Sequence, residues 1–119
     1  MGLVGRVPST SAGGEDAQSV AGFGLELILP AQVSFTPIFF DEQVFSFIQN
    51  FCPDILIISA GFDAHRNDPL AGINLVAKDF AYMTKRCLEI QPNLLLGLEG
   101  GYDLGALGEC CVMVAACLL

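Results

Sequence analysis

A chain of 119 residues holds one small domain or part of a larger one, and it leaves no room for a second complete domain. Hydrophobic residues make up 53% of the chain and charged residues 15%, which excludes a disordered tail and indicates a core segment that other sequence normally covers. The formal net charge of -8 argues against direct contact with nucleic acid, and no apolar stretch reaches the roughly 20 residues of a membrane helix. We therefore expect neither a nucleic-acid partner nor a membrane partner.

The cysteines of the chain indicate its redox compartment. They form an odd set of five without a CxxC pair, mostly in apolar stretches: Cys52, Cys87, Cys110, Cys111 and Cys117. A disulfide scaffold normally carries an even set, so we expect reduced thiols in the core. Thiols persist inside cells, which predicts an intracellular protein without distinguishing cytoplasm from nucleus.

The N-terminal part of the chain gives little structural signal. Residues 1–24 are predicted to form a flexible leader, because Pro8 to Gly24 is rich in Ser, Gly and Ala and has no helical or strand periodicity. Folded structure is expected over residues 25–119. Within it, Leu25 to Leu29 fits either a short strand or the start of a helix, and periodicity does not decide between them.

Helices and strands then alternate along the chain. The first predicted helix runs from Glu42 to Cys52, with Asp41 as its N-cap and Pro53 directly after it. The following apolar run, Ile55 to Ser59, is typical of a strand that is buried on both faces.

A second helix and a second strand repeat this order. The helix is predicted over Ala77 to Ile90, where Phe80, Met83 and Cys87 share one face. Leu94 to Leu98 then repeats the pattern of a buried strand.

The last predicted helix is capped by Asp103 and reaches about Cys117. Such an alternation indicates an α/β fold, with right-handed crossovers and a parallel sheet that carries helices on both faces. Functional groups in these folds lie at the carboxyl ends of the strands, where Asp63 and Tyr102 follow the two predicted strands. By position alone, a loop-capping carboxylate and a core tyrosine are the commoner roles for these two residues.

Two longer runs of the sequence are more specific than the positions of these two single residues. The run from Pro53 to Leu70, PDILIISAGFDAHRNDPL, resembles the zinc-ligand strand and loop of the histone deacetylase family, in its class II and bacterial acetylpolyamine amidohydrolase types. The run from Leu94 to Leu104, LLLGLEGGYDL, is similar to the glycine-rich turn of the same family, in the right order and at a suitable separation. The resemblance covers Cys52 to Leu119. It implies that residues 25–119 are the C-terminal part of a catalytic domain with a partial arginase/deacetylase-type fold.

The resemblance also implies an activity, the zinc-dependent removal of acetyl groups from lysine side chains of proteins or from acetylated polyamines. It makes Asp63 the second carboxylate ligand of Zn2+ and Tyr102 the hydroxyl that polarises the amide carbonyl. It places Leu70 in the wall of the acyl-lysine channel, and it lets the backbone approach the substrate at Gly100 and Gly101. The expected partner is an acetyl-lysine protein or an acetylated amine substrate.

The chain departs from that family in its metal ligands. The family supplies an Asp-x-His pair and a His-His pair upstream, whereas this sequence has a single histidine, His65. Because a catalytic zinc normally takes three protein ligands, we expect an incomplete Zn2+ site and an inactive isolated chain. His65 is not expected to join Asp63 as a ligand, since loop histidines more often face solvent. The alternative function is a catalytically inactive fragment that binds another chain, including a partner chain that completes the domain.

Three smaller features of the sequence bear on loop shape, helix capping and nucleotide binding. Asp68 and Pro69 are expected to shape their loop rather than to contact substrate. Val76 stands where the family has a hydroxyl residue that caps the next helix, a loss of about 1 kcal/mol. A nucleotide-binding domain is disfavoured, because neither G-x-G-x-x-G nor G-x-x-x-x-G-K-[ST] occurs in the glycine cluster from Gly97 to Gly108.

Overall fold

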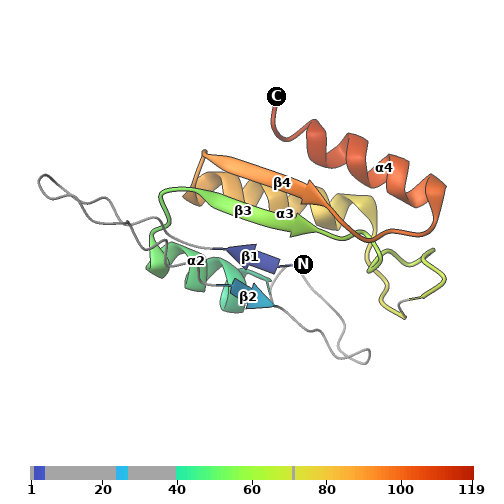
Figure 1. Cartoon of the computed structure of the whole chain (residues 1–119), viewed down its shortest axis with the longest axis horizontal. Helices are drawn as coiled ribbons and strands as arrows, with labels where there is room; N and C mark the ends of the chain where they lie inside the picture. Colours follow the sequence, from blue (N-terminus) through green and yellow to red (C-terminus); the bar gives the residue numbers. More distant parts are fainter. Residues whose placement is uncertain (1, 5–23, 27–39, 71) are drawn as a thin grey trace, which may run out of the picture.

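The computed structural model describes residues 2–4, 24–26, 40–70 and 72–119 (Figure 1). Its elements in chain order are β1 (Gly2–Val4), β2 (Gly24–Glu26), η1 (Phe40–Phe45), α2 (Ser46–Phe51), β3 (Leu56–Ala60), α3 (Ala77–Ile90), β4 (Leu94–Leu98) and α4 (Leu104–Ala115). The strands form one sheet in the order β2-β1-β3-β4. The predicted alternation of helix and strand from residue 40 onward is confirmed.

The sheet is mixed rather than purely parallel. β3 and β4 pair in parallel, with Leu56 opposite Leu94 and Ala60 opposite Leu98, as expected for strands that a helical crossover joins. β1 pairs antiparallel with both β2 and β3, which no pattern in the sequence indicated. Gly2–Val4 and Gly24 therefore lie in strands, although a leader was expected there, and the rest of that leader lies outside the described residues.

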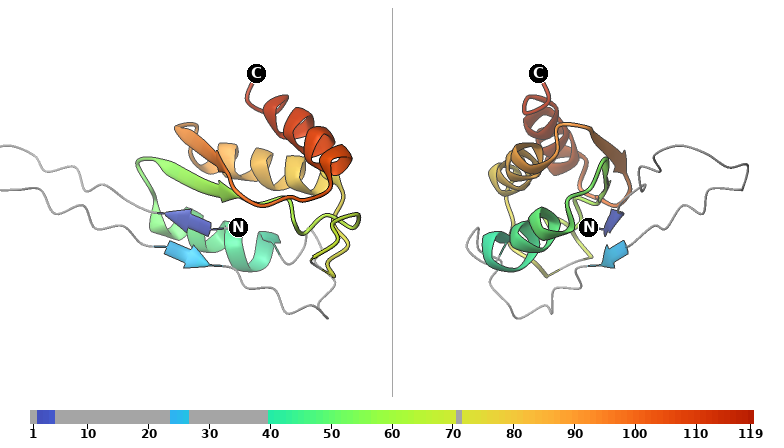
Figure 2. Two further views of the ribbon diagram at one scale, coloured as in Figure 1. Left: turned by 45° about the vertical axis from the view of Figure 1, so that its right-hand side comes forward. Right: turned by 90° about the vertical axis from the view of Figure 1, so that its left-hand side faces the viewer.

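The two parallel strands differ in burial. Leu56, Ile58 and Ala60 of β3 are buried, whereas Leu95 and Leu98 of β4 are 56% and 58% exposed. The expectation that Leu94–Leu98 is buried on both faces is therefore wrong. β4 lies at the end of the sheet. The described helices gather on one face of the sheet, whereas helices on both faces were expected (Figure 2). A strand at an edge with one covered face keeps part of its apolar surface exposed.

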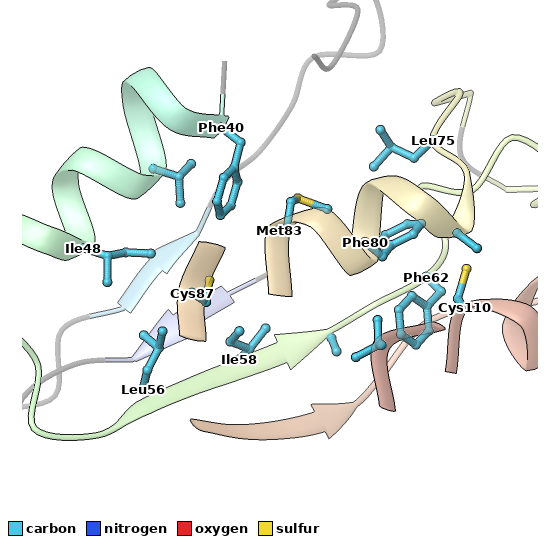
Figure 3. Packing of buried hydrophobic residues seen from close by; sticks show 14 residues of the cluster. Phe40, Ile48, Leu56, Ile58, Phe62, Leu75, Phe80, Met83, Cys87 and Cys110 are labelled. Carbon is cyan, nitrogen blue, oxygen red and sulfur yellow. The ribbon is translucent and has the colours of Figure 1, made fainter. Parts of the chain in front are cut away.

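The core lies between the sheet and the helices. Its largest fully buried side chains include Phe40 of η1, Ile58 of β3 and Cys87 of α3, which converge from three elements (Figure 3). Phe80, Met83 and Cys87 are all buried, so the predicted apolar face of α3 is confirmed. The bounds predicted for this helix, Ala77 to Ile90, also match the structure. None of the described helices is both long enough and apolar enough to cross a membrane.

The first helical segment begins earlier than expected. It runs from Phe40 through the π-helical η1 into α2, so Asp41 lies inside the helix and the expected N-cap is wrong. The helix ends at Phe51, one residue before the expected Cys52. Cys52 is the C-cap: it takes the left-handed conformation at φ 50 and donates its amide to the carbonyls of Ile48 and Gln49. A left-handed residue at this position is a common helix ending, usually supplied by glycine.

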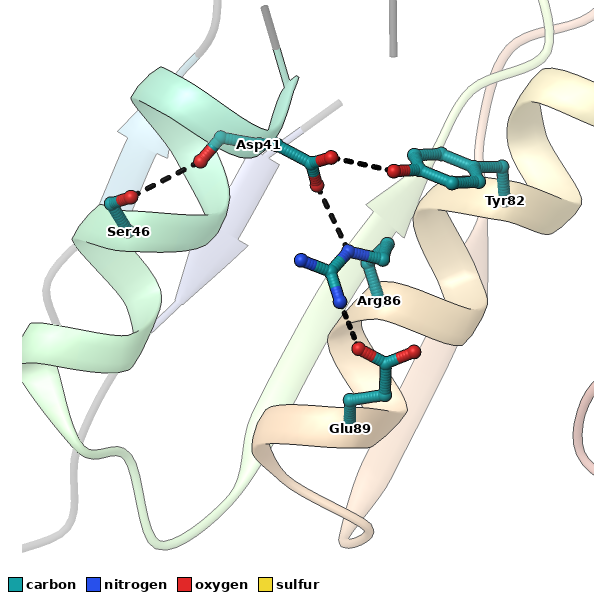
Figure 4. Close-up of polar contacts among 5 residues, drawn as sticks. All are labelled: Asp41, Ser46, Tyr82, Arg86 and Glu89. Carbon is teal, nitrogen blue, oxygen red and sulfur yellow. Dashed lines mark hydrogen bonds and ion pairs between the residues drawn. The ribbon is translucent and has the colours of Figure 1, made fainter. Parts of the chain in front are cut away.

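Asp41 binds α3 instead of capping a helix (Figure 4). Its carboxylate accepts hydrogen bonds from the Tyr82 hydroxyl at 2.6 Å and from Nε of Arg86 at 2.9 Å. The Arg86 guanidinium also pairs with Glu89 and lies 3.8 Å from the ring centroid of Phe45. These contacts, which we call the helical interface, join η1 to α3.

All five cysteines are free thiols. Cys87 and Cys110 are buried, whereas Cys52 is exposed, so only part of the set occupies the core as predicted. Burial raises the pKa of the Cys87 thiol to about 12 and that of Cys110 to about 11. Both buried thiols are therefore protonated at neutral pH and unreactive.

Candidate active site

Two loops meet where the parallel strands end. Residues 61–70 follow β3 and residues 99–103 follow β4, and we call these two loops the rim. The Glu99 amide donates to the Ala60 carbonyl at 3.0 Å, and the Phe62 amide donates to the Gly100 carbonyl at 2.8 Å. The hydrogen bonding of the sheet thus continues into both loops, which holds their backbones side by side at the carboxyl edge.

Asp63 lies between two glycines of the rim. A Cβ atom at Gly61 would lie 3.0 Å from Oδ1 of Asp63, and one at Gly100 would lie 3.0 Å from Oδ2. Both distances are shorter than real Cβ atoms normally allow, so a side chain at either position would displace the carboxylate. The close approach that Gly100 makes in this structure is to the Asp63 carboxylate, whereas the resemblance assigned it to substrate.

Gly101 is required for a different reason. Its φ of +135 lies in a region that side chains rarely adopt, and a Cβ atom there would lie 3.2 Å from Leu107 and 3.3 Å from Phe62. Tyr102, the next residue, is 59% exposed. Its exposure overturns the interpretation from position alone, which made it a core tyrosine. The glycine turn therefore presents the phenol at the surface of the rim.

Asp68 links the two loops of the rim and is itself only 8% exposed. Its Oδ1 accepts a hydrogen bond from the Leu70 amide at 2.9 Å, and its Oδ2 accepts one from the Tyr102 amide at 2.8 Å. The expectation that Asp68 shapes its own loop is confirmed by the first contact. The second contact was not predicted, because nothing local in the sequence marks a partner 34 residues away. One signal was available, an aspartate next to proline within the run from Pro53 to Leu70 that carried the resemblance.

Leu70, at the end of the first rim loop, is bound by the carboxylate of Asp68 as well. Its side chain is 73% exposed, and its amide shares Asp68 with the amide of Tyr102. The structure therefore brings all the residues predicted from the resemblance to one edge: Asp63, Leu70, Gly100, Gly101 and Tyr102. Leu70 and Tyr102 are both exposed, at 73% and 59%, on the two loops of the rim.

His65 does not face solvent, so that expectation is wrong. Its side chain is 3% exposed, because the loop folds back and the residue pairs with Leu75 through an isolated bridge. The Arg66 amide donates to the Leu75 carbonyl at 2.8 Å, and the Leu75 amide donates to the Ala64 carbonyl at 3.1 Å. Nδ1 of His65 accepts a hydrogen bond from the Asn67 amide at 3.2 Å, which occupies one of its two nitrogens.

The described residues do not form a zinc site on their own. No three His, Cys, Asp or Glu side chains among residues 2–4, 24–26, 40–70 and 72–119 form a group that could hold a metal ion. A catalytic zinc takes three protein ligands and keeps a fourth position open. Asp63 by itself would provide too few ligands for a catalytic zinc, and its carboxylate is confined between two glycines.

The amino end of α4 also bears on the nucleotide-binding alternative. Oδ1 of Asp103 accepts a hydrogen bond from the Ala106 amide at 2.7 Å, so the predicted cap is confirmed. A carboxylate thus occupies the position in which a bound phosphate would accept the same amide. The helix itself ends at Ala115, slightly before the expected Cys117.

Comparisons with known proteins agree on one family. The model of the histone deacetylase domain matches residues 9–118, which begins further upstream than the residues that carried the resemblance. The chain is 42% identical over 75 residues to histone deacetylase 10, chloroplastic, of Oryza sativa subsp. japonica, covering 59% of this chain and 17% of that protein. An uncharacterized protein of Synechocystis sp. is 46% identical over 70 residues, covering 59% of this chain and 23% of the relative.

The solved structures give the same result. The HD domain of HDA15 superposes with a TM-score of 0.67 at 35% identity, over 69% of this chain and 24% of that one. This confirms the arginase/deacetylase-type fold in partial form, and the chain spans about a quarter or less of the relatives it matches. The chain belongs to the histone deacetylase family.

Proposed function

We propose that this chain supplies part of the catalytic site of a zinc-dependent deacetylase, with Asp63 as one metal ligand and Tyr102 as the donor that stabilises the oxyanion. The substrate would be an acetylated lysine side chain of a protein or an acetylated polyamine, which is hydrolysed to acetate and a free amine. The observation that supports this most directly is the position of Asp63 and Tyr102 on two loops that hydrogen bonds join at the carboxyl ends of β3 and β4.

The chemistry of Tyr102 follows from its exposure and its backbone. A phenol hydroxyl donates a hydrogen bond to an amide carbonyl oxygen, and this bond strengthens as the oxygen gains negative charge in the tetrahedral state. Such a donor helps only if it is held in place before the reaction. The Tyr102 amide is bonded to the buried Asp68, so its backbone is fixed while its side chain stays exposed.

The family also favours lysine as the source of the acetyl group. Relatives with the name histone deacetylase include histone deacetylase 7 of Homo sapiens, which is 39% identical over 74 residues. The exposed Leu70 suits the aliphatic part of a lysine side chain, which carries four methylene groups before its nitrogen. An acidic chain of net charge -8 also tolerates a cationic substrate protein.

The first test is deacetylation of a fluorogenic acetyl-lysine peptide by the purified chain with added zinc. The matched variants are Asp63→Asn, which keeps the shape of the side chain and removes its charge, and Tyr102→Phe, which removes only the hydroxyl. Activity that falls at least about 100-fold in both variants would establish that the chain itself forms a working site.

A chimera tests the proposal when the isolated chain is inactive. The part of this chain that aligns with the HDA15 HD domain, 69% of the chain, replaces the aligned 24% of that domain, whose remaining residues supply the rest of the site. We expect the chimera to deacetylate the peptide and Tyr102→Phe to lower its kcat by about 100-fold or more. A chimera that folds and binds zinc but has no activity would contradict the proposal.

One observation favours a second function, a catalytically inactive fragment that acts by binding another chain. The described residues lack a three-ligand metal group, so on their own they would not hold a catalytic zinc. The chimera distinguishes the two functions. A deacetylase part should give an active chimera, whereas an inactive fragment should give a chimera without deacetylase activity.

A further inference from the structure

Tyr102 is the proposed oxyanion donor, yet few contacts of its side chain fix the position of the phenol. The phenol is 59% exposed, so packing restrains it little. The preceding residue, Gly101, adopts φ +135 and has no side chain to limit its rotation. Something other than packing must therefore set the direction in which the phenol leaves the backbone.

We propose that Asp68 is the positioning residue of Tyr102, and that its buried carboxylate sets the place of the phenol hydroxyl relative to Asp63. Asp68 and Asp63 lie on the same loop after β3, whereas Tyr102 lies on the loop after β4. The Oδ2 atom of Asp68 holds the Tyr102 amide at 2.8 Å across these two loops. This inference rests on the proposed function for its catalytic meaning, but the contact itself has its own test.

The carboxylate is well placed to act as a fixed point. Oδ1 accepts the Leu70 amide at 2.9 Å, and the Asp68 amide donates to the His65 carbonyl at 2.9 Å. The side chain is therefore held by its own loop before it reaches Tyr102. At 8% exposure, its hydrogen bonds are strengthened by the low local dielectric.

Both carboxylate oxygens are in use, which makes Asp68→Asn a sensitive variant. Asparagine has almost the same shape, but it offers one oxygen acceptor, and its amino group would face the other amide as a second donor. Either Leu70 or Tyr102 must lose its partner. Asp79→Asn is the matched control, because Oδ2 of Asp79 also accepts a backbone amide, that of Val76 at 2.8 Å, outside the rim.

The experiment uses the full chain labelled with 3-fluorotyrosine and observed by fluorine NMR. The chain has two tyrosines, Tyr82 and Tyr102, so each signal can be assigned with a single Tyr→Phe variant. In Asp68→Asn we expect the Tyr102 signal to shift and sharpen as the side chain gains freedom, while the Tyr82 signal stays in place. Tyr82 is the internal reference, because Asp41 holds its hydroxyl at 2.6 Å.

Hydrogen exchange gives a second readout on the same variants. The Tyr102 amide should exchange roughly tenfold faster or more when its hydrogen bond to the Asp68 carboxylate is lost. Asp79→Asn should change neither the Tyr102 fluorine signal nor the exchange of its amide. Asp68→Ala removes both carboxylate oxygens and so must break the contact with Tyr102. Unchanged Tyr102 readouts in both Asp68→Asn and Asp68→Ala, or equal changes in Asp68→Asn and Asp79→Asn, would overturn the inference.

A measurement on the unmodified chain covers the case in which Asp68→Asn does not fold. A scalar coupling across the hydrogen bond, between the amide nitrogen of Tyr102 and the carboxyl carbon of Asp68, is expected in the wild type, and its absence would also overturn the inference. Failure of the proposed function would look different. In that case the coupling and the fluorine shift are present, and the chimera with the HDA15 domain has no deacetylase activity.

Discussion

The rim and the helical interface each depend on an aspartate that binds a segment far away in the sequence, but they do so differently. At the rim, the buried Asp68 accepts hydrogen bonds from two backbone amides, and glycines let the loops approach closely. At the helical interface, the partly exposed Asp41 binds the side chains of Tyr82 and Arg86. Backbone contacts restrain a loop more tightly than long side chains do, so the rim should be sensitive to geometry and the helical interface to pH and salt.

The largest effect is expected at Gly101 of the rim. In Gly101→Ala the new Cβ would meet Leu107 at 3.2 Å and Phe62 at 3.3 Å at a φ of +135. Strain and crowding together should lower the free energy of unfolding by about 3 kcal/mol, as measured by urea denaturation. Gly108→Ala in α4 is the control, because nothing lies within 4 Å of its Cβ position. That variant should gain about 0.5–1 kcal/mol, and equal stabilities of the two variants would contradict the comparison.

The next effect lies at the start of α3, between the rim and the helical interface. Val76 is the N-cap residue and makes no side-chain cap bond, while its amide donates to Asp79 at 2.8 Å. In Val76→Thr the new hydroxyl can accept the amide of Asp79 and complete the missing half of a capping box. We expect the free energy of unfolding to rise by about 1 kcal/mol in thermal or urea melts. Val76→Ala, which adds no hydroxyl, should show no such gain.

A smaller gain is expected at the end of α2. Cys52 holds the left-handed conformation with φ 50, which a residue with a side chain adopts at some cost. Cys52→Gly removes that cost but adds freedom to the unfolded chain, for a net stabilisation of about 0.5 kcal/mol. Cys52→Ala keeps the Cβ atom and loses the thiol, so it should not be more stable than the wild type. A melting temperature that rises equally in both variants would point to the thiol instead of the backbone.

The smallest effect is expected at the helical interface itself. The hydrogen bond from Tyr82, followed by that from Arg86, lowers the pKa of Asp41 in the folded state. A lowered pKa contributes stability that is present above the pKa of the unfolded chain, about 4, and is lost as pH falls through the pKa of the folded state. The melting temperature should thus fall further between about pH 6 and about pH 3 in the wild type than in Asp41→Asn.

Two conditions identify the source of this pH dependence. Tyr82→Phe removes the larger cause of the shift, so it should weaken the dependence while Arg86 remains. Added salt should weaken it further, because partly exposed charges are screened. A pH dependence that Asp41→Asn leaves unchanged would show that other carboxylates carry it.

Much of the fold could be predicted because its signals are local. The helix Ala77–Ile90 and the strand Leu94–Leu98 have the bounds that periodicity and the prolines indicated. The start of the first helix could not be placed in this way, because Asp41 has the composition of a cap but a stronger pair of partners on α3. The pairing of β3 with Gly2–Val4 also joins segments that are far apart in the sequence, so local propensity could not reveal it.

The candidate site also has features that local sequence order predicted and features that depend on neighbours in space. The order of its residues along two strand ends sufficed to bring Asp63 and Tyr102 to one edge, and the roles assigned to them stay predictions. The burial of His65 and the exposure of β4 depend on what lies beside each residue in space, which no local pattern records.

By itself, the sequence determined the alternation of elements, the family and the two loops that carry the candidate residues, because each rests on neighbours within a few positions. The tertiary structure decided which groups touch across those loops. Asp68 reaches Tyr102 across 34 positions, and the carboxylate of Asp63 fits between Gly61 and Gly100. Hydrogen bonds and close contacts of this kind depend on the pairing of β3 with β4, so they exist only once the chain has folded.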